Sequence, residues 1–229
     1  MNSNVAPFRI RLAGANDIEL IMSLLDEVIT WLADLGLDQW QGNRARQRQH
    51  VATDIGEESL FVVEKLGKVV ATITIDEQAD ADFWRHKDNP LSALYVHRMA
   101  VAPAEAGIGL GSAMLDWAAE QVERRDRALL RLDAWSTNDK LHHYYEQLGF
   151  EMLRNERVVG RGSGALFSRP AAERFDCGPV LDDLVGPRQT MVTGAREHVG
   201  EPSSPSAPDV VSDGARPRLT ARNKSGASR

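Results

Sequence analysis

The sequence predicts an α/β fold, in which a sheet flanked by helices forms a single domain of residues 1–170. Within this range the hydrophobic pattern changes between a period of two, typical of half-buried strands, and a period of 3.6, typical of amphipathic helices. Two β-branched runs also flank a glycine turn, which indicates a hairpin. With 42% hydrophobic residues among 229, the composition is that of an ordinary globular domain with an appendage.

The first half of the domain is expected to begin with a strand and a helix. The predicted elements are a strand at 8–12, helices at 18–32 and 43–55, strands at 60–64 and 69–75, and a polar, Asp-rich loop at 76–90. Asn16 and Asp17 offer helix-capping side chains just before apolar residues repeat at helical spacing. Gly67 marks the turn of the predicted hairpin.

The second half alternates strands and helices. The predicted elements are a strand at 93–101, a helix starting at 110, a strand at 129–135, a helix at 141–148, and a closing hairpin of 150–159 with 165–168. Leu110, Met114 and Trp117 mark the buried side of the long helix. Gly149 is expected to end the helix before it.

Charge and composition exclude several classes of protein. The formal net charge of −6 argues against a broad nucleic-acid surface, because such surfaces depend on clustered Lys and Arg. A single cysteine, Cys177, cannot form an intramolecular disulfide, and His142 with His143 lacks a third ligand nearby, so we expect no metal. Neither a signal peptide nor a membrane span is indicated, and a cytoplasmic protein is expected.

The composition changes at Pro170. Beyond this residue Phe175 is the only aromatic side chain, and the Ser- and Pro-rich stretch 201–208 cannot pack a core. We therefore expect residues 171–229 to form a disordered tail. Its last residues are basic, and either an anionic partner or a solvated tail accounts for that charge.

A glycine cluster separates the strand at 93–101 from the long helix. It reads Ala106-Gly-Ile-Gly-Leu-Gly-Ser112, and glycines in such a place let backbone N–H groups converge on an anion. A P-loop needs a lysine between Gly111 and Ser112, and none is present. The dinucleotide fingerprint needs a glycine at position 112 or 114, which hold Ser112 and Met114.

The cluster instead resembles the signature of the GNAT superfamily of acetyl-CoA-dependent N-acyltransferases. That signature, Gln/Arg-x-x-Gly-x-Gly/Ala, lies between the fourth strand and the third helix of the superfamily. Residues 106–111 are similar to it, although Ala106 stands where Gln or Arg is usual. A second segment, Asn138 followed by Tyr144-Tyr-Glu-Gln-Leu-Gly-Phe150, resembles another superfamily motif. The resemblance covers residues 8–168 and none of the tail.

The resemblance implies a mixed, mostly antiparallel sheet with a splay between strands 4 and 5 that holds acetyl-CoA. It places the strand backbone at Met99 and Val101 against the pantetheine arm. It also places the amides of Gly107, Gly109, Gly111 and Ser112 on the pyrophosphate, while Ala106 leaves out a side-chain contribution. Asn138 either holds the pantetheine or only caps the following helix.

Transfer of an acetyl group to an amine needs a base for the amine and an acid for the leaving thiolate. Tyr145 occupies the position of the superfamily's usual general acid; the alternative is that it only packs between helix and sheet. His97 is a candidate base because its intrinsic pKa is near 6.5. Two positions from Met99, His97 is expected on the same face as Met99 and Tyr95. A structural histidine and a relay through ordered water remain alternatives.

The acceptor side is expected near the connection between the first two helices, where Gln39 and Trp40 lie, and near Trp135 at the end of the fifth strand. The predicted function is transfer of an acetyl group from acetyl-CoA to a primary amine of a small molecule or protein. A catalytically degenerate coenzyme A-binding or interaction protein of the same fold is the alternative. Superfamily members often form homodimers, and the closing hairpin is a candidate surface.

Overall fold

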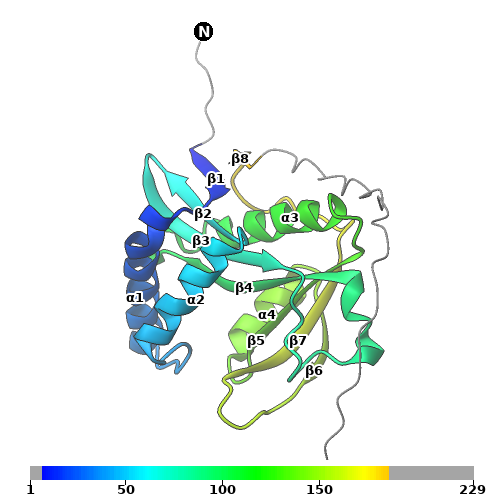
Figure 1. The fold of residues 1–229 in the computed structure, drawn as a ribbon. Helices are drawn as coiled ribbons and strands as arrows, with labels where there is room; N and C mark the ends of the chain where they lie inside the picture. The colour runs from blue at the N-terminus through cyan, green and yellow to red at the C-terminus, as the bar shows by residue number, and fades with distance from the viewer. Residues whose placement is uncertain (1–6, 186–229) are drawn as a thin grey trace, which may run out of the picture. The chain divides into compact units, whose positions relative to one another are not determined.

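The computed structural model describes residues 7–185, which form one eight-stranded sheet with four α-helices (Figure 1). The strands are β1 (Phe8–Leu12), β2 (Leu60–Lys65), β3 (Lys68–Asp76), β4 (Ala93–Val101), β5 (Leu129–Trp135), β6 (Glu151–Asn155), β7 (Ser163–Pro170) and β8 (Leu181–Asp183). The helices are α1 (Ile18–Asp34), α2 (Arg44–Gly56), α3 (Leu110–Glu123) and α4 (Asp139–Gln147). The strand order is β6-β7-β5-β4-β3-β2-β1-β8.

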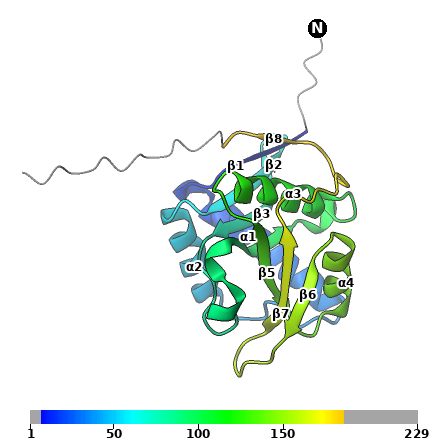
Figure 2. The same cartoon turned by 90° about the vertical axis from the view of Figure 1, so that its right-hand side faces the viewer.

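The sheet is mixed and mostly antiparallel, which confirms the expected fold class. Strands β4 and β5 pair in parallel, as do β1 and β8, and the other neighbours are antiparallel. A parallel pair needs a crossover connection, and α3 supplies the one between β4 and β5. Helices α1 and α2 lie on one face of the sheet, and α3 and α4 lie on the other (Figures 1 and 2). Within residues 7–185, no helix is long and apolar enough to cross a membrane.

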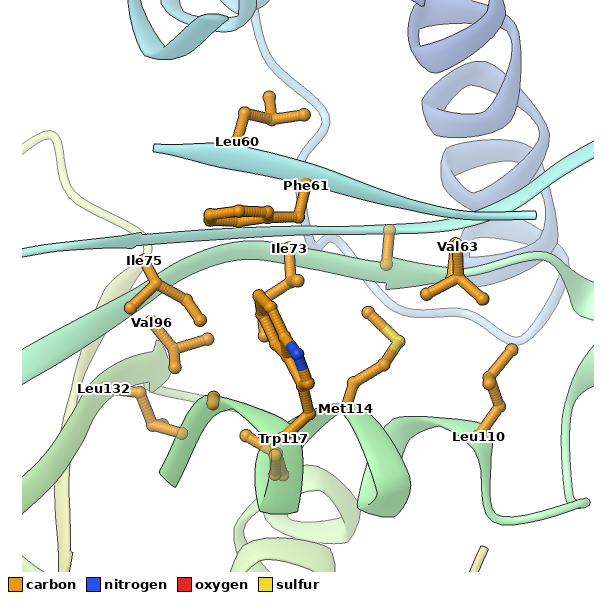
Figure 3. Close-up of a cluster of buried hydrophobic side chains, with 14 of the residues drawn as sticks. Leu60, Phe61, Val63, Ile73, Ile75, Val96, Leu110, Met114, Trp117 and Leu132 are labelled. Atoms are coloured by element: carbon orange, nitrogen blue, oxygen red, sulfur yellow. The ribbon is translucent and has the colours of Figure 1, made fainter. Parts of the chain in front are cut away.

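The core between α3 and the sheet fixes the position of this helix. Met114 and Trp117 point from α3 toward strand residues that include Phe61, Ile73 and Val96 (Figure 3). The rings of Phe61 and Trp117 meet edge to face with their centroids 4.9 Å apart. Since burial of large apolar side chains is the main favourable term in folding, this contact holds the middle of α3 against the sheet.

Strands β4 and β5 separate partway along their length. Their pairing runs from Ala93 with Leu129 to Val96 with Leu132 and stops there. Beyond that point β4 continues to Val101 beside β3, and β5 continues to Trp135 beside β7. The edges of β4 and β5 that face each other are therefore open past Val96 and Leu132, as the splay predicted from the sequence requires.

A β-bulge interrupts the pairing of β3 with β4 at the start of this splay. Thr74 pairs with His97, whereas Thr72 pairs with Ala100, so β4 holds one extra residue between the two pairs. Arg98 takes that place with φ of 46°, in the left-handed region. Because side chains alternate along a regular strand, the extra residue reverses the alternation.

The bulge overturns the expectation that His97 and Met99 share a face. Met99 lies on the α3 side, where a Cβ on Gly111 would be 3.6 Å from its methyl group. His97 lies on the opposite side with Tyr95, and the centroids of their rings are 6.5 Å apart. His97 and Met99 are two residues apart, but the bulge between them places their side chains on opposite faces of the sheet.

The residues that the structure describes continue past Pro170, and they include a further strand. Residues 171–180, called the strap below, run along α3 and lead into β8, which pairs with β1 at the far edge of the sheet (Figure 2). The buried carboxylate of Asp116 in α3 holds the strap, because it accepts hydrogen bonds from the backbone N–H groups of Phe175 and Asp176 at 3.0 and 2.9 Å. The rest of the expected tail, 186–229, lies outside the described residues.

We expect Asp116→Ala to lower the free energy of unfolding by about 3–5 kcal/mol, because it leaves a buried cation without its partner. Arg169 is 0% exposed, and its guanidinium donates to Asp116 Oδ1 at 3.1 Å. Urea denaturation followed by circular dichroism measures the change. The control is Glu120→Ala on the same helix, whose exposed ion pair with Arg124 contributes at most about 1 kcal/mol. Equal stability of the two variants would contradict the structural role of Asp116.

Candidate active site

A cavity of about 1060 Å³ lies at the splay between β4 and β5. Its apolar wall comes from the two strands and α4, through Val96, Met99, Leu132, Ala134 and Tyr145. Its polar wall comes from α2, the loop before α2, the end of β3, and the loop before β7. Apolar strand ends with convergent polar groups are the usual composition of a small-molecule site.

His97 lies between two carboxylates in this cavity. Its Nε2 is 3.3 Å from Asp76 Oδ1 at the end of β3, and its Nδ1 is 4.0 Å from Asp133 Oδ1 on β5. Burial disfavours the charged imidazolium, but the hydrogen bond to Asp76 and the charges of both carboxylates outweigh it. The pKa of His97 is therefore raised above its ordinary value.

Burial also disfavours the charged form of the neighbouring acid, Asp133. It raises the pKa of Asp133, although the charge of His97 and a hydrogen bond with Ser163 partly offset this effect. Asp80, farther along the wall, is paired with Arg161, which also pairs with Asp82. The His97 end of the cavity thus carries an excess of carboxylates over cations, and such a surface attracts an ammonium group.

Tyr145 lines the same cavity from α4 and is only 7% exposed. Its ring packs against Phe150 and Phe167, with centroid distances of 5.7 and 5.5 Å. Burial raises the pKa of its phenol, so the hydroxyl stays protonated at neutral pH. The ring is thus packed between helix and sheet while the residue also lines the cavity, so the two interpretations of Tyr145 are compatible.

Tyr144 has a different environment. It does not line the cavity, and a Cβ on Gly111 would lie 2.6 Å from its hydroxyl. Burial raises the pKa of Tyr144 to about 12. The side chain thus fills the space between α4 and the start of α3, which separates its role from that of Tyr145.

The glycine loop forms the start of α3. Gly107 and Gly109 both have φ of 80°, a conformation that L side chains rarely adopt. The backbone N–H groups in the first turn of α3 have no partner within the helix, which is the usual basis of an anion site. The hydroxyl of Ser112 in this turn is buried and has no hydrogen-bond partner among residues 7–185. These unsatisfied donors fit the pyrophosphate of coenzyme A.

The strap lies directly on this loop. A Cβ added to Gly109 would be 2.3 Å from the carbonyl oxygen of Cys177, and one added to Gly178 would be 2.2 Å from the carbonyl oxygen of Gly109. Only two glycines facing each other permit such an approach. Nothing in the amino-acid sequence indicates that Cys177 lies beside the loop.

The structure brings only part of the predicted coenzyme set to the cavity. Met99 lines it, whereas Val101, Ala106, Gly107, Gly109, Gly111, Ser112 and Asn138 do not. Asn138 caps α4, since its Oδ1 accepts from the N–H of Leu141 at 3.1 Å, and its amide nitrogen donates to Gln39 Oε1 at 3.1 Å. The capping interpretation of Asn138 is confirmed, and its coenzyme role stays a prediction.

The three residues predicted for the acceptor side, Gln39, Trp40 and Trp135, all line the cavity. Gln39 is buried, and its carbonyl accepts the hydrogen bond from Asn138. The indole nitrogen of Trp135 donates to Asp38 Oδ1 at 2.8 Å, which ties the end of β5 to the loop before α2. Their contact with an acceptor stays a prediction.

Sequence reasoning missed Arg98 and its partner Asp54. Both line the cavity, and Arg98 Nε donates to Asp54 Oδ2 at 2.6 Å. Thr74 Oγ1 donates to the same oxygen at 2.9 Å. The sequence carries no signal for this pair, because it depends on the bulge that turns Arg98 toward α2.

A splayed pair of parallel strands beside a helix that starts with glycines defines the coenzyme A-dependent acyltransferase class of fold. The comparisons with known proteins agree. Residues 24–150 match the sequence model described as "Acetyltransferase (GNAT) family". The chain belongs to the GNAT family of acetyltransferases.

Named relatives come from Bacillus subtilis. The chain is 33% identical over 141 residues to the uncharacterized N-acetyltransferase YesJ, covering 60% of this chain and 78% of the relative. It is 31% identical over 170 residues to S-alkylcysteine N-acetyltransferase, covering 72% and 91%. A paiA N-acetyltransferase from Thermoplasma acidophilum, solved in complex with coenzyme A, has the same fold with a TM-score of 0.55. It is 14% identical, and the match covers 71% of this chain and 98% of that chain.

Proposed function

We propose that the protein transfers the acetyl group of acetyl-CoA directly to a primary amine of a small molecule. The observation that carries this proposal is a single cavity that holds His97 between two carboxylates at one wall and Tyr145 at another. A base and an acid on opposite sides of an open splay are what transfer from a thioester to an amine requires.

His97 and Tyr145 have distinct roles in the proposed reaction. The acceptor nitrogen attacks the thioester carbonyl while His97, oriented by Asp76, takes the proton that the nitrogen loses. The carbon–sulfur bond then breaks, and Tyr145 supplies a proton to the departing thiolate. No covalent intermediate with the protein is needed, because both partners are bound at once.

The glycine loop binds the coenzyme in this proposal. The amides of Leu110, Gly111 and Ser112 lie in the first turn of α3, and the positive end of the helix dipole favours phosphate oxygens there. The orphaned hydroxyl of Ser112 supplies one more donor. Ala106 is exposed and contributes no charged side chain, so binding rests on the main chain.

A small molecule is favoured as acceptor because one named relative acts on S-alkylcysteine. The test is to incubate purified protein with acetyl-CoA and S-methylcysteine, and to measure free thiol and the acetylated product by mass spectrometry. Thiol release that depends on the amine supports the proposal. Saturable acetyl-CoA binding without release for any amine in a panel would instead support the coenzyme-binding protein that has lost catalysis.

We expect Asp76→Asn to move the acidic limb of the pH profile of kcat/KM to lower pH. His97 must be neutral to accept a proton, so activity rises with pH through its pKa. Asp76 raises that pKa, as does Asp133, while burial and Arg98 lower it. Removing the charge of Asp76 therefore lowers the pKa, and the neutral form appears at lower pH.

The control for this profile is Asp34→Asn, which removes an exposed carboxylate of α1 that does not line the cavity. Its profile should coincide with that of the parent protein. If Asp76→Asn also leaves the limb in place, His97 is not the group that titrates, and a relay through water becomes the better account of proton removal.

A further inference from the structure

Beside His97 the cavity has a group of basic side chains that the proposed reaction does not use. Arg46 and His50 of α2 line it together with Arg98 of β4. The acids on this side are Asp54, which pairs with Arg98, and Glu57, which accepts a hydrogen bond from Gln78. The side chain of Arg46 has no hydrogen bond or ion pair within residues 7–185.

Arg98 is only partly satisfied by its partner. Its Nε and Nη2 both face the same oxygen of Asp54, while Nη1 has no partner among the described residues. The carboxylate of Asp54 is also shared with Thr74. One face of the guanidinium thus remains available on the cavity side, and its planar fork suits a carboxylate.

The backbone at Arg98 is strained. A residue with a side chain in the left-handed region costs about 1–2 kcal/mol per residue, and Arg98 has φ of 46°. The bulge turns this side chain toward α2, on the same side of the sheet as His97. Strain of this kind persists where the surrounding structure holds it, and it concentrates at functional sites.

The groups around His97 and those along α2 therefore suit different parts of an acceptor. Near His97, Asp76 and Asp133 attract an ammonium group. Near α2, Arg46 and Arg98 equal the acids Asp54 and Glu57 in number, but only Arg98 is paired, with Asp54. The pKa of His50 is lowered because burial and the charge of Arg98 favour its neutral form. A neutral His50 can donate a hydrogen bond without adding charge.

We propose that Arg98 binds the carboxylate of the acceptor, so that the substrate is an amino acid and not a simple amine. This inference rests on the proposed acetyl transfer and deepens it. Arg98 holds the carboxylate with Arg46 and His50 beside it, and this anchors the amino group toward His97. Arg98 is thus the specificity-determining residue, because it binds the carboxylate of the acceptor, which the reaction leaves unchanged.

The experiment compares two acceptors that differ only in the carboxylate, S-methylcysteine and 2-(methylthio)ethylamine, with acetyl-CoA and the full chain. A charge-assisted hydrogen bond predicts a kcat/KM about 10- to 100-fold higher for the amino acid. We expect Arg98→Gln to reduce this ratio to near one, mostly through KM, while Arg98→Lys restores part of it. A parent protein without preference for the amino acid would overturn the proposal.

Two further variants keep the test interpretable. The double variant Arg98→Gln with Asp54→Asn avoids a buried unpaired carboxylate and should lose the preference as the single variant does. Arg44→Gln changes an arginine of α2 that pairs with Asp26 outside the cavity, and it should keep the parent ratio. If the double variant folds and keeps the full ratio, Arg98 does not read the carboxylate.

A binding measurement separates the two proposals. The carboxylate 3-(methylthio)propanoate lacks the amine and cannot be acetylated, so calorimetry reports its binding without turnover. Binding to the parent protein that is lost in Arg98→Gln supports the carboxylate site even if no amine is acetylated, in which case only the proposed reaction fails. Acetylation of both amines at equal rates, with no binding of this probe, leaves the reaction in place and overturns the site.

Discussion

Tyr145→Phe is expected to lower kcat by about 10²- to 10³-fold, within the range of general acid catalysis. The substitution removes the phenol hydroxyl at the cavity and keeps the ring between Phe150 and Phe167, so the packing of α4 is preserved. Acetyl-CoA affinity should stay within about threefold, because the glycine loop proposed to bind the coenzyme is at the start of α3 and not on α4. Steady-state kinetics and calorimetry with acetyl-CoA measure the two quantities.

The matched control is Tyr144→Phe, one residue earlier on the same helix. Its hydroxyl lies against the start of α3 and not in the cavity, so kcat should change by no more than about threefold. A loss of kcat equal to that of Tyr145→Phe would mean that both tyrosines act through helix packing. Equal losses of affinity and turnover in Tyr145→Phe would lead to the same conclusion.

Gly109→Val is expected to abolish saturable acetyl-CoA binding. Its φ of 80° strains any branched side chain, and its Cβ would be 2.3 Å from the carbonyl oxygen of Cys177. Because neither the loop nor the strap can keep its position, the amides at the start of α3 no longer converge on one point. Calorimetry measures the binding, and circular dichroism checks that the sheet and helices remain.

Gly67→Val provides the control for strain alone. Gly67 also has φ of 80°, but no atom lies within 4 Å of an added Cβ in the turn between β2 and β3. This variant should lose about 1–2 kcal/mol of stability and keep its affinity for acetyl-CoA. Unchanged binding in Gly109→Val would show that the loop does not hold the coenzyme.

Most of the fold could be predicted from the sequence because its signals are local. The hairpin around Gly67 and the buried side of α3 follow from patterns within a few residues. Strand β8 could not be predicted, since Leu181–Asp183 is too short to show alternation and pairs with β1 from the other end of the chain. The bulge at Arg98 could not be predicted either, because the pattern of residues 93–101 is that of one continuous strand.

The residues of the candidate site also fall into those that local sequence motifs predict and those that only the fold brings together. Gly109 and Tyr145 lie in short motifs that can be recognised without a structure. The contact of His97 with Asp76 and Asp133 requires three neighbouring strands in register, and the sequence alone places the two acids in separate segments. The contact of Arg98 with Asp54 depends on the register of β3 with β4 and on the position of α2. The residues next to Arg98 in the sequence therefore could not predict it.

The path of the strap places a natural labelling site, Cys177, beside the glycine loop. Cys177 is the only cysteine in the sequence and is exposed, yet its carbonyl oxygen touches the glycine loop. A fluorophore or spin label attached to this thiol would report on events at the start of α3 without any engineered residue. The acetyl-CoA binding proposed for the loop can thus be tested in real time, before any acceptor has been identified.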